Sequence, residues 1–328
     1  MQRYKIAIDT KGSDKGARTI IKGASIALSQ NEDLELLLVG DKDEIENEAR
    51  ELNMPLDRLE ILDAKDVITN YDSPSVAIFE KQDSSLVKAL EATSIRDDIK
   101  GLLCAGSTGA LMAGSMRYLS GKNRVRPSLA AVLPSENGEL TCLLDTGATI
   151  DCGASTLLHF AKIGTAFMKR MYGIESPRVG LLSNGAERTK GNKIVKEAHE
   201  LLEAEKELNF IGNVEGSNAL SGICDVLVCD GFAGNQVLKV TEGTATRIIK
   251  DIVRYAKRTG SKEIMELVGH LMSVYDISSL GGGIVLGIEK PVIKAHGCCD
   301  EKAIDNTTKM LLNMAKNIAV YDKKNNKI

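Results

Sequence analysis

Several polar residues of this chain lie on glycine-rich turns, where their side chains are placed to hold an anion. Lys190 precedes a Gly-Asn pair at the start of a helical pattern, Asn213 and Glu215 flank a second turn, and Asn235 follows a third. Glycine lets the backbone approach a ligand closely. A helix start presents free N–H groups and the positive end of a dipole. An ammonium group beside such N–H groups would clamp one phosphate, so we predict a site for phosphate or an oxyanion.

Glycine-rich turns of this kind occur six times, each at the end of an apolar run. They are Asp9–Asp14, Cys104–Gly109, Asp145–Asp151, Ser183–Asn192, Gly212–Ser217 and Asp230–Asn235. In an α/β sheet such turns gather at the carboxyl ends of the strands, where ligands bind. The alternative is that Asn192 and Asn235 only cap helices and that Lys190 is a solvated charge.

The composition and the missing motifs exclude several classes of function. The 328 residues carry 42 basic and 45 acidic side chains, a net charge of −3, which gives no general attraction to nucleic acid. No G-x-x-x-x-G-K-[ST] loop, no G-x-G-x-x-G after the first apolar run and no G-x-S-x-G elbow occurs. Nucleotide hydrolysis, dinucleotide redox chemistry and serine hydrolysis are therefore disfavoured.

The cysteines and the chain start predict a cytoplasmic protein. The first residues lack the apolar stretch of a signal peptide, and no run of 18 apolar residues is present. Seven cysteines, an odd number, indicate reduced thiols. The pair Cys298-Cys299 beside His296 suggests a metal, but neighbouring residues point in different directions and the chain has only four histidines. We predict no metal site.

The chain alternates between short apolar strands and helical patterns, which predicts a three-layer α/β/α sandwich. The expected strands are Tyr4–Asp9, Leu34–Val39, Gly101–Cys104, Leu129–Leu133, Leu140–Asp145, Arg178–Leu182, Leu208–Ile211, Val226–Asp230, Ile284–Gly287 and Val292–Ala295. The expected helices are Ala17–Ser29, Lys42–Leu52, Ser84–Thr93, Thr108–Ser120, Ser155–Met171, Asn192–Glu207, Gly234–Arg258, Lys262–Met272 and Asp300–Ala319. The short turn at 134–138 predicts a hairpin and hence a mostly parallel but mixed sheet. We expect one catalytic domain over 1–321 and a flexible polar tail at 322–328.

Several long motifs in the right order make the chain similar to the phosphate acyltransferase (PlsX) family from Ile6 to about Ala315. They are Lys81–Ser85, Ala105–Ala113, Lys190–Asn192, Phe210–Gly216, Asp230–Lys239 and Val292–Gly297. The resemblance implies transfer of a fatty acyl group from acyl carrier protein to orthophosphate, giving acyl phosphate for phospholipid synthesis. It also implies a homodimer with the fold of isocitrate and isopropylmalate dehydrogenases, without their redox cofactor.

The motifs and turns together assign the candidate site. The catalytic candidates are Lys190, Asn213 and Asn235. The candidates for binding phosphate or substrate are Asp9, Gly12, Ser107, Thr108, Gly109, Asp145, Thr149, Asn192, Glu215, Asp230, Lys239 and His296. Orthophosphate would attack the thioester carbonyl directly, so no cofactor and no acyl-enzyme is expected. A covalent route through Cys104 or Cys152 is disfavoured because neither has a histidine nearby in sequence.

Departures from the family pattern at these loops leave the acyl donor open. Ser13, Lys15, Ser107, Thr149, Ala186 and Arg188 replace the usual residues. Lys15 and Arg188 make the entrance to the predicted site more basic, which suits a different or more anionic acyl donor. One alternative is a paralogue that forms a short acyl phosphate, such as acetyl phosphate, in a reductase complex. Another is a non-catalytic module that binds phosphate or acyl carrier protein.

The helical pattern Lys262–Met272 carries a broad apolar face. Ile264, Leu267, Val268 and Leu271 follow helical spacing on that face. The resemblance implies a protruding helix pair that packs at the dimer and touches the membrane. Because acidic residues offset the nearby lysines and arginine, we expect a dimer with at most transient membrane contact.

Overall fold

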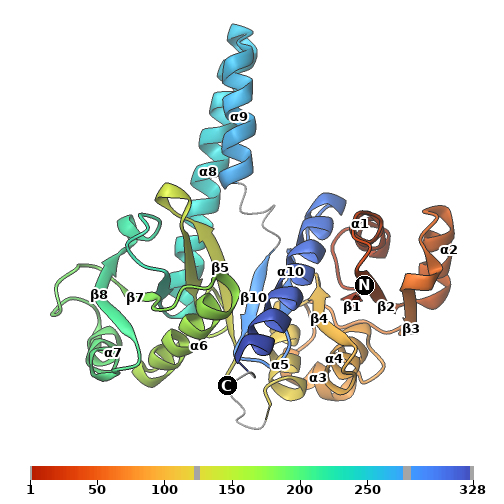
Figure 1. Ribbon diagram of the computed structural model, residues 1–328, viewed down its shortest axis with the longest axis horizontal. Helices are drawn as coiled ribbons and strands as arrows, with labels where there is room; N and C mark the ends of the chain where they lie inside the picture. The colour runs from red at the N-terminus through yellow and green to blue at the C-terminus, as the bar shows by residue number, and fades with distance from the viewer. Residues whose placement is uncertain (1, 122–125, 276–281, 326–328) are drawn as a thin grey trace. The chain divides into compact units, whose positions relative to one another are not determined.

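The computed structural model describes residues 2–121, 126–275 and 282–325 (Figure 1). The chain divides into two compact units. Unit 1 combines Met1–Ser128 with Ser279–Ile328, and unit 2 is the segment Leu129–Ser278 between them. The single catalytic domain expected over 1–321 covers both units, and its extent stays a prediction.

Unit 1 is built on a mostly parallel sheet. Its strands are β1 (Tyr4–Asp9), β2 (Leu34–Gly40), β3 (Leu59–Asp63), β4 (Ile99–Cys104), β10 (Gly283–Leu286) and β11 (Val292–Lys294). They lie in the order β3-β2-β1-β4-β11-β10, and only the β10–β11 pair is antiparallel. The helices are α1 (Ala17–Gln30), α2 (Lys42–Glu51), α3 (Pro74–Glu80), α4 (Ser85–Ile95), α5 (Thr108–Tyr118) and α10 (Glu301–Asn325), with a 3-10 turn η1 at Leu56–Arg58.

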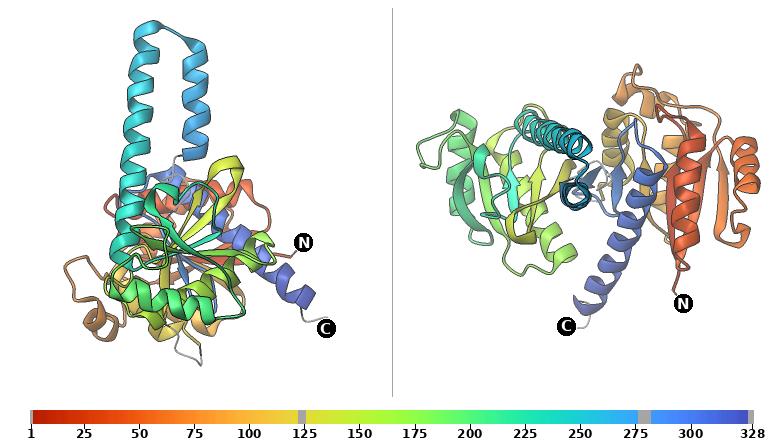
Figure 2. Two further views of the ribbon diagram at one scale, coloured as in Figure 1. Left: turned by 90° about the vertical axis from the view of Figure 1, so that its left-hand side faces the viewer. Right: turned by 90° about the horizontal axis from the view of Figure 1, so that it is seen from above.

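The helices of unit 1 cover both faces of its sheet. Helices α1 and α10 pack side by side on one face, and α4 packs on the other (Figure 2). Parallel strands joined by right-handed crossovers place successive helices on one face until the strand order reverses. The order reverses at β1, because β2 lies on one side of it and β4 on the other. The loops after β1 and β4 therefore flank the position where open α/β sheets bind ligands.

Unit 2 has a mixed sheet of its own. Its strands are β5 (Ser128–Pro134), β6 (Leu140–Leu144), β7 (Arg178–Ser183), β8 (Asn209–Glu215) and β9 (Val226–Val228), in the order β5-β6-β9-β7-β8. Its helices are α6 (Ala154–Tyr172), α7 (Lys193–Ala204), α8 (Gly231–Thr259) and α9 (Lys262–Tyr275), with 3-10 turns η2 at Glu136–Gly138 and η3 at Gly216–Asn218. The antiparallel β5–β6 hairpin confirms the predicted turn, and the remaining pairs are parallel. Helices α8 and α9 form a hairpin that extends away from this sheet (Figure 1).

The predicted α/β class with a mostly parallel, mixed sheet is confirmed, but some elements differ. Strand β3 was not expected, since it is a half-buried edge strand without a long apolar run. The short helix α3 was also missed. Helix α8 begins at Gly231 rather than Gly234, and α10 continues to Asn325 rather than ending at Ala319. The last residues of the expected tail, 326–328, lie outside the described residues.

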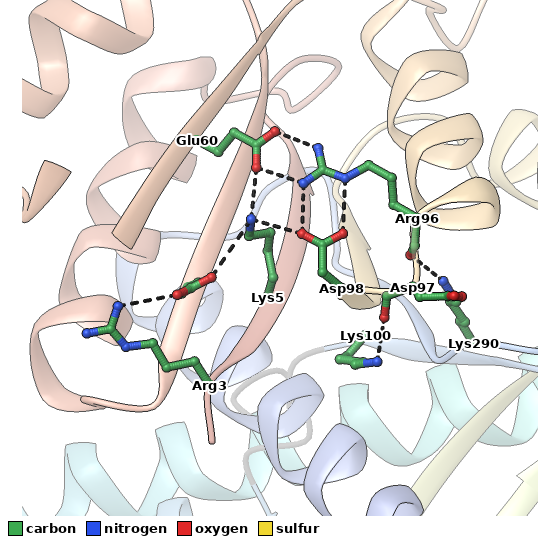
Figure 3. A network of polar contacts seen from close by, with 9 residues as sticks. Arg3, Lys5, Glu60, Arg96, Asp97, Asp98, Lys100 and Lys290 are labelled. Atoms are coloured by element: carbon green, nitrogen blue, oxygen red, sulfur yellow. Dashed lines mark hydrogen bonds and ion pairs between the residues drawn. The ribbon is translucent and has the colours of Figure 1, made fainter. Parts of the chain in front are cut away.

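An ion network joins the amino ends of the strands of unit 1 (Figure 3). The Arg96 guanidinium donates to Glu60 Oε2 and to Asp98 Oδ2, both at 2.8 Å. The Lys5 ammonium lies 2.9 Å from Glu60 and 3.0 Å from Asp98. The hydrogen bond from Arg96 lowers the pKa of Glu60 to about 2 and lowers the pKa of Asp98 as well. This network lies at the opposite ends of the strands from the glycine-rich loops.

Candidate functional site

A cavity of about 470 Å³ opens in unit 2 at the carboxyl ends of β7 and β9. In the sheet, β8 lies on one side of β7 and β9 lies on the other. The strand order therefore reverses at β7. The residues lining the cavity are Leu157, Leu181, Leu182, Ser183, Asn184, Gly191, Asn192, Ile194, Val195, Cys229, Asp230 and Ala233. The starts of α7 and α8 therefore both contribute to one cavity wall, as expected for a ligand site at a reversal of strand order.

Lys190 lies on the β7–α7 loop, whose backbone is held in place by hydrogen bonds. Asn184 Oδ1 accepts from the Gly191 N–H at 2.8 Å, and the Lys190 N–H donates to the Glu187 carbonyl at 3.0 Å. The side chain of Lys190 is exposed. In the described part of the chain it forms no ion pair. An exposed ammonium on an anchored loop is available to an anionic ligand.

The start of α7 next to Lys190 is capped by Asn192. Its Oδ1 accepts from the Val195 N–H at 2.9 Å, so the capping alternative for this residue agrees with the structure. The cap satisfies one N–H group of the first turn. Nearby, the Ser183 hydroxyl at the end of β7 is buried and has no hydrogen-bond partner among the described residues.

Asn213 is buried in β8, and its amide is occupied by protein groups. The His199 Nδ1 donates to Asn213 Oδ1 at 3.0 Å, while Asn213 Nδ2 donates to the Glu187 carbonyl at 2.9 Å. Asn213 thus ties the Lys190 loop to α7 and β8. Its contacts are those of a positioning residue. Glu215, expected beside it at a turn, is the last residue of β8.

Asp145 holds together the loop after β6. Its carboxylate is fully buried and accepts from the Leu129 N–H at 2.8 Å and from the Thr149 N–H at 2.6 Å. Burial raises the pKa of this carboxyl, against the effect of the backbone donors. Thr149 is itself buried, and its Oγ1 has no partner in the described residues.

The start of α8 packs directly on this loop. A Cβ at Gly231 would lie 2.6 Å from Asp145 Oδ2, and one at Gly234 would lie 2.0 Å from the Asp145 carbonyl oxygen. The cap of α8 is Asp230, whose Oδ1 accepts from the Ala233 N–H at 2.7 Å. The expectation that Asn235 stands at the helix start is therefore wrong, since Asn235 lies one turn inside α8. Lys239, further along, is exposed and pairs with Glu242 at 2.8 Å.

In unit 1 the predicted residues gather at the loops after β1 and β4. The Cys104 thiol donates to Asp9 Oδ2 at 3.4 Å. Gly12 has φ +78°, and a Cβ there would lie 2.9 Å from Gly106 Cα, so the two loops touch through their backbones. Burial raises the pKa of Asp9 to about 6.

The β4–α5 loop and the start of α5 carry three further candidates. Ser107 caps α5, with its Oγ accepting from the Ala110 N–H at 3.4 Å. Thr108 and Gly109 form the first turn of α5, and a Cβ at Gly109 would lie 2.7 Å from Pro74 Cγ. Gly109 therefore allows α5 to pack closely against α3.

Lys294 is a residue that the sequence analysis missed. It ends β11 beside Cys104 and is 8% exposed. Its ammonium donates to the carbonyls of Ala105 and Ala295, and burial lowers its pKa. A lysine within the apolar strand pattern Val292–Ala295 is the sequence feature that could have marked it as a buried cation. His296 follows two residues later, in the loop to α10.

The Cys104 thiol and the two added cations, Lys15 and Arg188, also bear on the predicted chemistry. Burial raises the pKa of the Cys104 thiol, which opposes formation of the thiolate that a covalent route requires. Arg188, expected to make the entrance more basic, pairs with Glu203 at 2.8 Å, which offsets its charge. Lys15 is exposed.

Comparison with known proteins identifies the family. The model of the family described as "Fatty acid synthesis protein" matches residues 4–320. A phosphate acyltransferase of Thermoanaerobacter pseudethanolicus is 42% identical over 319 residues, covering 95% of this chain and 94% of the relative. A phosphate acyltransferase of Lactococcus lactis is 40% identical over 317 residues, covering 94% of each. The chain belongs to the phosphate acyltransferase (PlsX) family. It is an acyltransferase.

Solved structures agree with the fold of this phosphate acyltransferase family member. A phosphotransacetylase from Streptococcus pyogenes matches with a TM-score of 0.63 at 17% identity, covering 97% of this chain and 94% of that one. A 4-hydroxythreonine-4-phosphate dehydrogenase from Burkholderia phymatum matches with a TM-score of 0.53 at 15% identity, covering 97% and 98%. The predicted dehydrogenase-like fold is thus confirmed. In the described part of the chain, no helix is both long and apolar enough to span a bilayer.

Proposed function

We propose that this enzyme transfers an acyl group from the thioester of acyl carrier protein to orthophosphate, giving an acyl phosphate for phospholipid synthesis. The observation that carries the proposal is the position of Lys190. Its free ammonium stands on an anchored loop beside the unit 2 cavity and the start of α7. A cation next to a helix start suits a dianionic nucleophile. The phosphate acyltransferase relatives support the transfer of an acyl group to phosphate.

In the proposed reaction, an oxygen of orthophosphate attacks the thioester carbonyl carbon. Lys190 holds the phosphate or the developing oxyanion, and the first turn of α7 supplies N–H groups. The C–O bond forms, the C–S bond breaks, and the thiolate leaves and takes up a proton. Orientation of the two reactants and stabilisation of the oxyanion account for the rate. Asn213 acts through the loop that it holds in place.

For unit 1 we propose a further substrate contact at its own reversal of strand order. Asp9, Ser107 and Thr108 lie on the two loops that flank it, and Lys294 supplies a buried cation there. Crystals soaked with phosphate or sulfate test this assignment together with that of unit 2. We expect the anion within hydrogen-bond distance of at least two of the glycine-rich loops. An anion bound only elsewhere would contradict it.

The deciding experiment measures acyl phosphate formed from a panel of thioesters, with and without orthophosphate. Long-chain acyl carrier protein, long-chain acyl-CoA and acetyl thioesters are the donors. We expect phosphate-dependent turnover that is highest with long-chain acyl carrier protein. Turnover with acetyl thioesters alone would favour the short-chain paralogue. Absence of product with every donor would favour a non-catalytic binding module.

We also propose that the enzyme is a homodimer that pairs through the α8–α9 hairpin. Val268 is buried within the hairpin, but Val240, Ile248 and Leu267 are 64%, 53% and 49% exposed. An apolar groove of about 400 Å³ lies between the helices. Such apolar surface is typical of an interface. Light scattering should give twice the chain mass, and Ile248→Glu should shift the measured mass towards that of the monomer.

For the membrane, we expect only weak, transient binding. Vesicle flotation of the wild type, with Leu267→Glu as the control, measures it.

A further inference from the structure

We propose that the unit 2 cavity binds the acyl group of the donor, with Ser183 as a hydrogen-bond donor to the acyl carbonyl oxygen and Ile194 as a determinant of chain length. This inference rests on the proposed function, because it names the substrate group that the cavity holds. It adds two residues, neither of them among the predicted site residues, to the reaction.

Three polar side chains that line the cavity are each engaged through one oxygen. The Oδ1 atoms of Asn184, Asn192 and Asp230 each accept a backbone N–H, at 2.8, 2.9 and 2.7 Å. The Ser183 hydroxyl is buried and has no partner in the residues that the structure describes. An unpaired buried hydroxyl is costly, so a ligand acceptor that reaches it gains the full hydrogen bond. The Ser183 hydroxyl is thus a buried donor at this cavity without a partner in the described chain.

Most of the other side chains that line the cavity are apolar. Leu157, Leu181 and Cys229 are almost fully buried and form its inner part, while Ile194 is 38% exposed on the first turn of α7. Leu182, Val195 and Ala233 complete the apolar lining. A volume of about 470 Å³ falls in the range of small-molecule sites.

A buried unpaired donor in a mostly apolar cavity matches a ligand with a carbonyl and a hydrocarbon chain. The pantetheine arm of the donor is a poorer match, since its two amides would lie against the apolar side chains that form most of the wall. With the acyl chain in the cavity, the thioester carbonyl lies at the end of β7, on the same loop as Lys190. As orthophosphate adds, the carbonyl oxygen gains negative charge, and the Ser183 hydroxyl donates to it. The oxygen then returns its electron pair as the C–S bond breaks.

The first test replaces the donor. Ser183→Ala should lower kcat about 100-fold, the scale of losing one oxyanion donor, with the KM for orthophosphate unchanged. The control is Ser176→Ala, an exposed serine just before the other end of β7, which should keep wild-type turnover. Wild-type kcat in Ser183→Ala would overturn the role of Ser183.

The second test changes the size of the cavity mouth. Ile194→Trp should lower kcat/KM for long acyl chains relative to short ones, by about fourfold for each methylene that no longer fits, and Ile194→Ala should favour longer chains. The matched control is Leu201→Trp, on the same helix with a similar exposure of 40% but outside the cavity. An active Ile194→Trp variant with the wild-type chain-length profile would overturn the acyl site alone. A wild-type protein without phosphate-dependent turnover would overturn both this inference and the proposed function.

Discussion

Lys190 and Asn213 belong to one hydrogen-bonded loop, but their surroundings give them different tasks. Lys190 is exposed and unpaired in the described structure, so its charge is available to a ligand. Asn213 is buried between the His199 ring and the Glu187 carbonyl. Removing Lys190 takes away a charge without disturbing packing. Removing Asn213 leaves the buried His199 Nδ1 without this partner, while the Glu187 carbonyl keeps the Lys190 N–H.

We therefore expect the two alanine variants to differ in stability more than in activity. Lys190→Ala should lower turnover by about 100-fold and leave the urea midpoint unchanged. Asn213→Ala should lower turnover too, but should also destabilise the fold by about 1–3 kcal/mol, because the buried His199 Nδ1 is left unsatisfied. Lys193→Ala, an exposed lysine on the same helix start, is the control. Full activity in a folded Lys190→Ala protein would contradict the assignment.

The sequence was informative about this loop and less so about what surrounds it. A lysine before Gly-Asn at a helix start is a local pattern, so the sequence alone predicts Lys190 beside the start of α7. The contact of Asn213 with His199 joins a strand to a helix, and no local pattern encodes it. From the sequence alone, either Asp230 or Asn235 could cap the helix that follows β9. Only the packing of Gly231 and Gly234 on the Asp145 loop fixes the first turn and makes Asp230 the cap.

The position of the start of α8 depends on two glycines that have no side chain. Gly231 and Gly234 let the helix contact the Asp145 loop without intervening atoms. Strands were predictable because continuous apolar runs mark buried strands. Edge strand β3 is half buried, and its Leu-Glu-Ile-Leu-Asp sequence lacks that mark.

Two glycine-to-alanine changes in α8 should have opposite effects. Gly234→Ala would place a Cβ 2.0 Å from the Asp145 carbonyl oxygen, so the helix start must shift, and both Tm and activity should fall. Gly243→Ala lies in the same helix with no atom within 4 Å of the new Cβ. It should be neutral or raise stability by up to about 1 kcal/mol. Thermal unfolding of both variants checks this, and an unchanged Tm for Gly234→Ala would refute the packing argument.

At the scale of the whole molecule, the network around Arg96 links stability to pH. Glu60 ionises with a pKa of about 2 in the folded chain instead of its ordinary value of 4.5. A depressed pKa contributes stability that is fully present above pH 4.5 and is lost as the pH falls towards 2. Because Glu60 is partly exposed, solvent screens much of this contribution.

Arg96→Gln should therefore lower the urea midpoint at pH 7, and its difference from the wild type should shrink between pH 4.5 and pH 2. Arg50→Gln serves as the control, since Arg50 pairs with Glu46 only at 3.8 Å on the exposed surface of α2. A constant difference between Arg96→Gln and wild type down to pH 2 would show that the network does not set the acid sensitivity.

Unit 1 is assembled from both ends of the chain, and this has a consequence for how the protein emerges from the ribosome. Strand β4 pairs with β11, which is synthesised roughly 190 residues later, and α10 comes later still. At about 5–20 residues per second, the β11 side of β4 stays unpaired for roughly 10 to 40 s. Unit 2 emerges complete within that interval. The nascent chain thus carries an open strand edge, a known starting point for aggregation. Its protection by a chaperone would matter most until β11 has emerged.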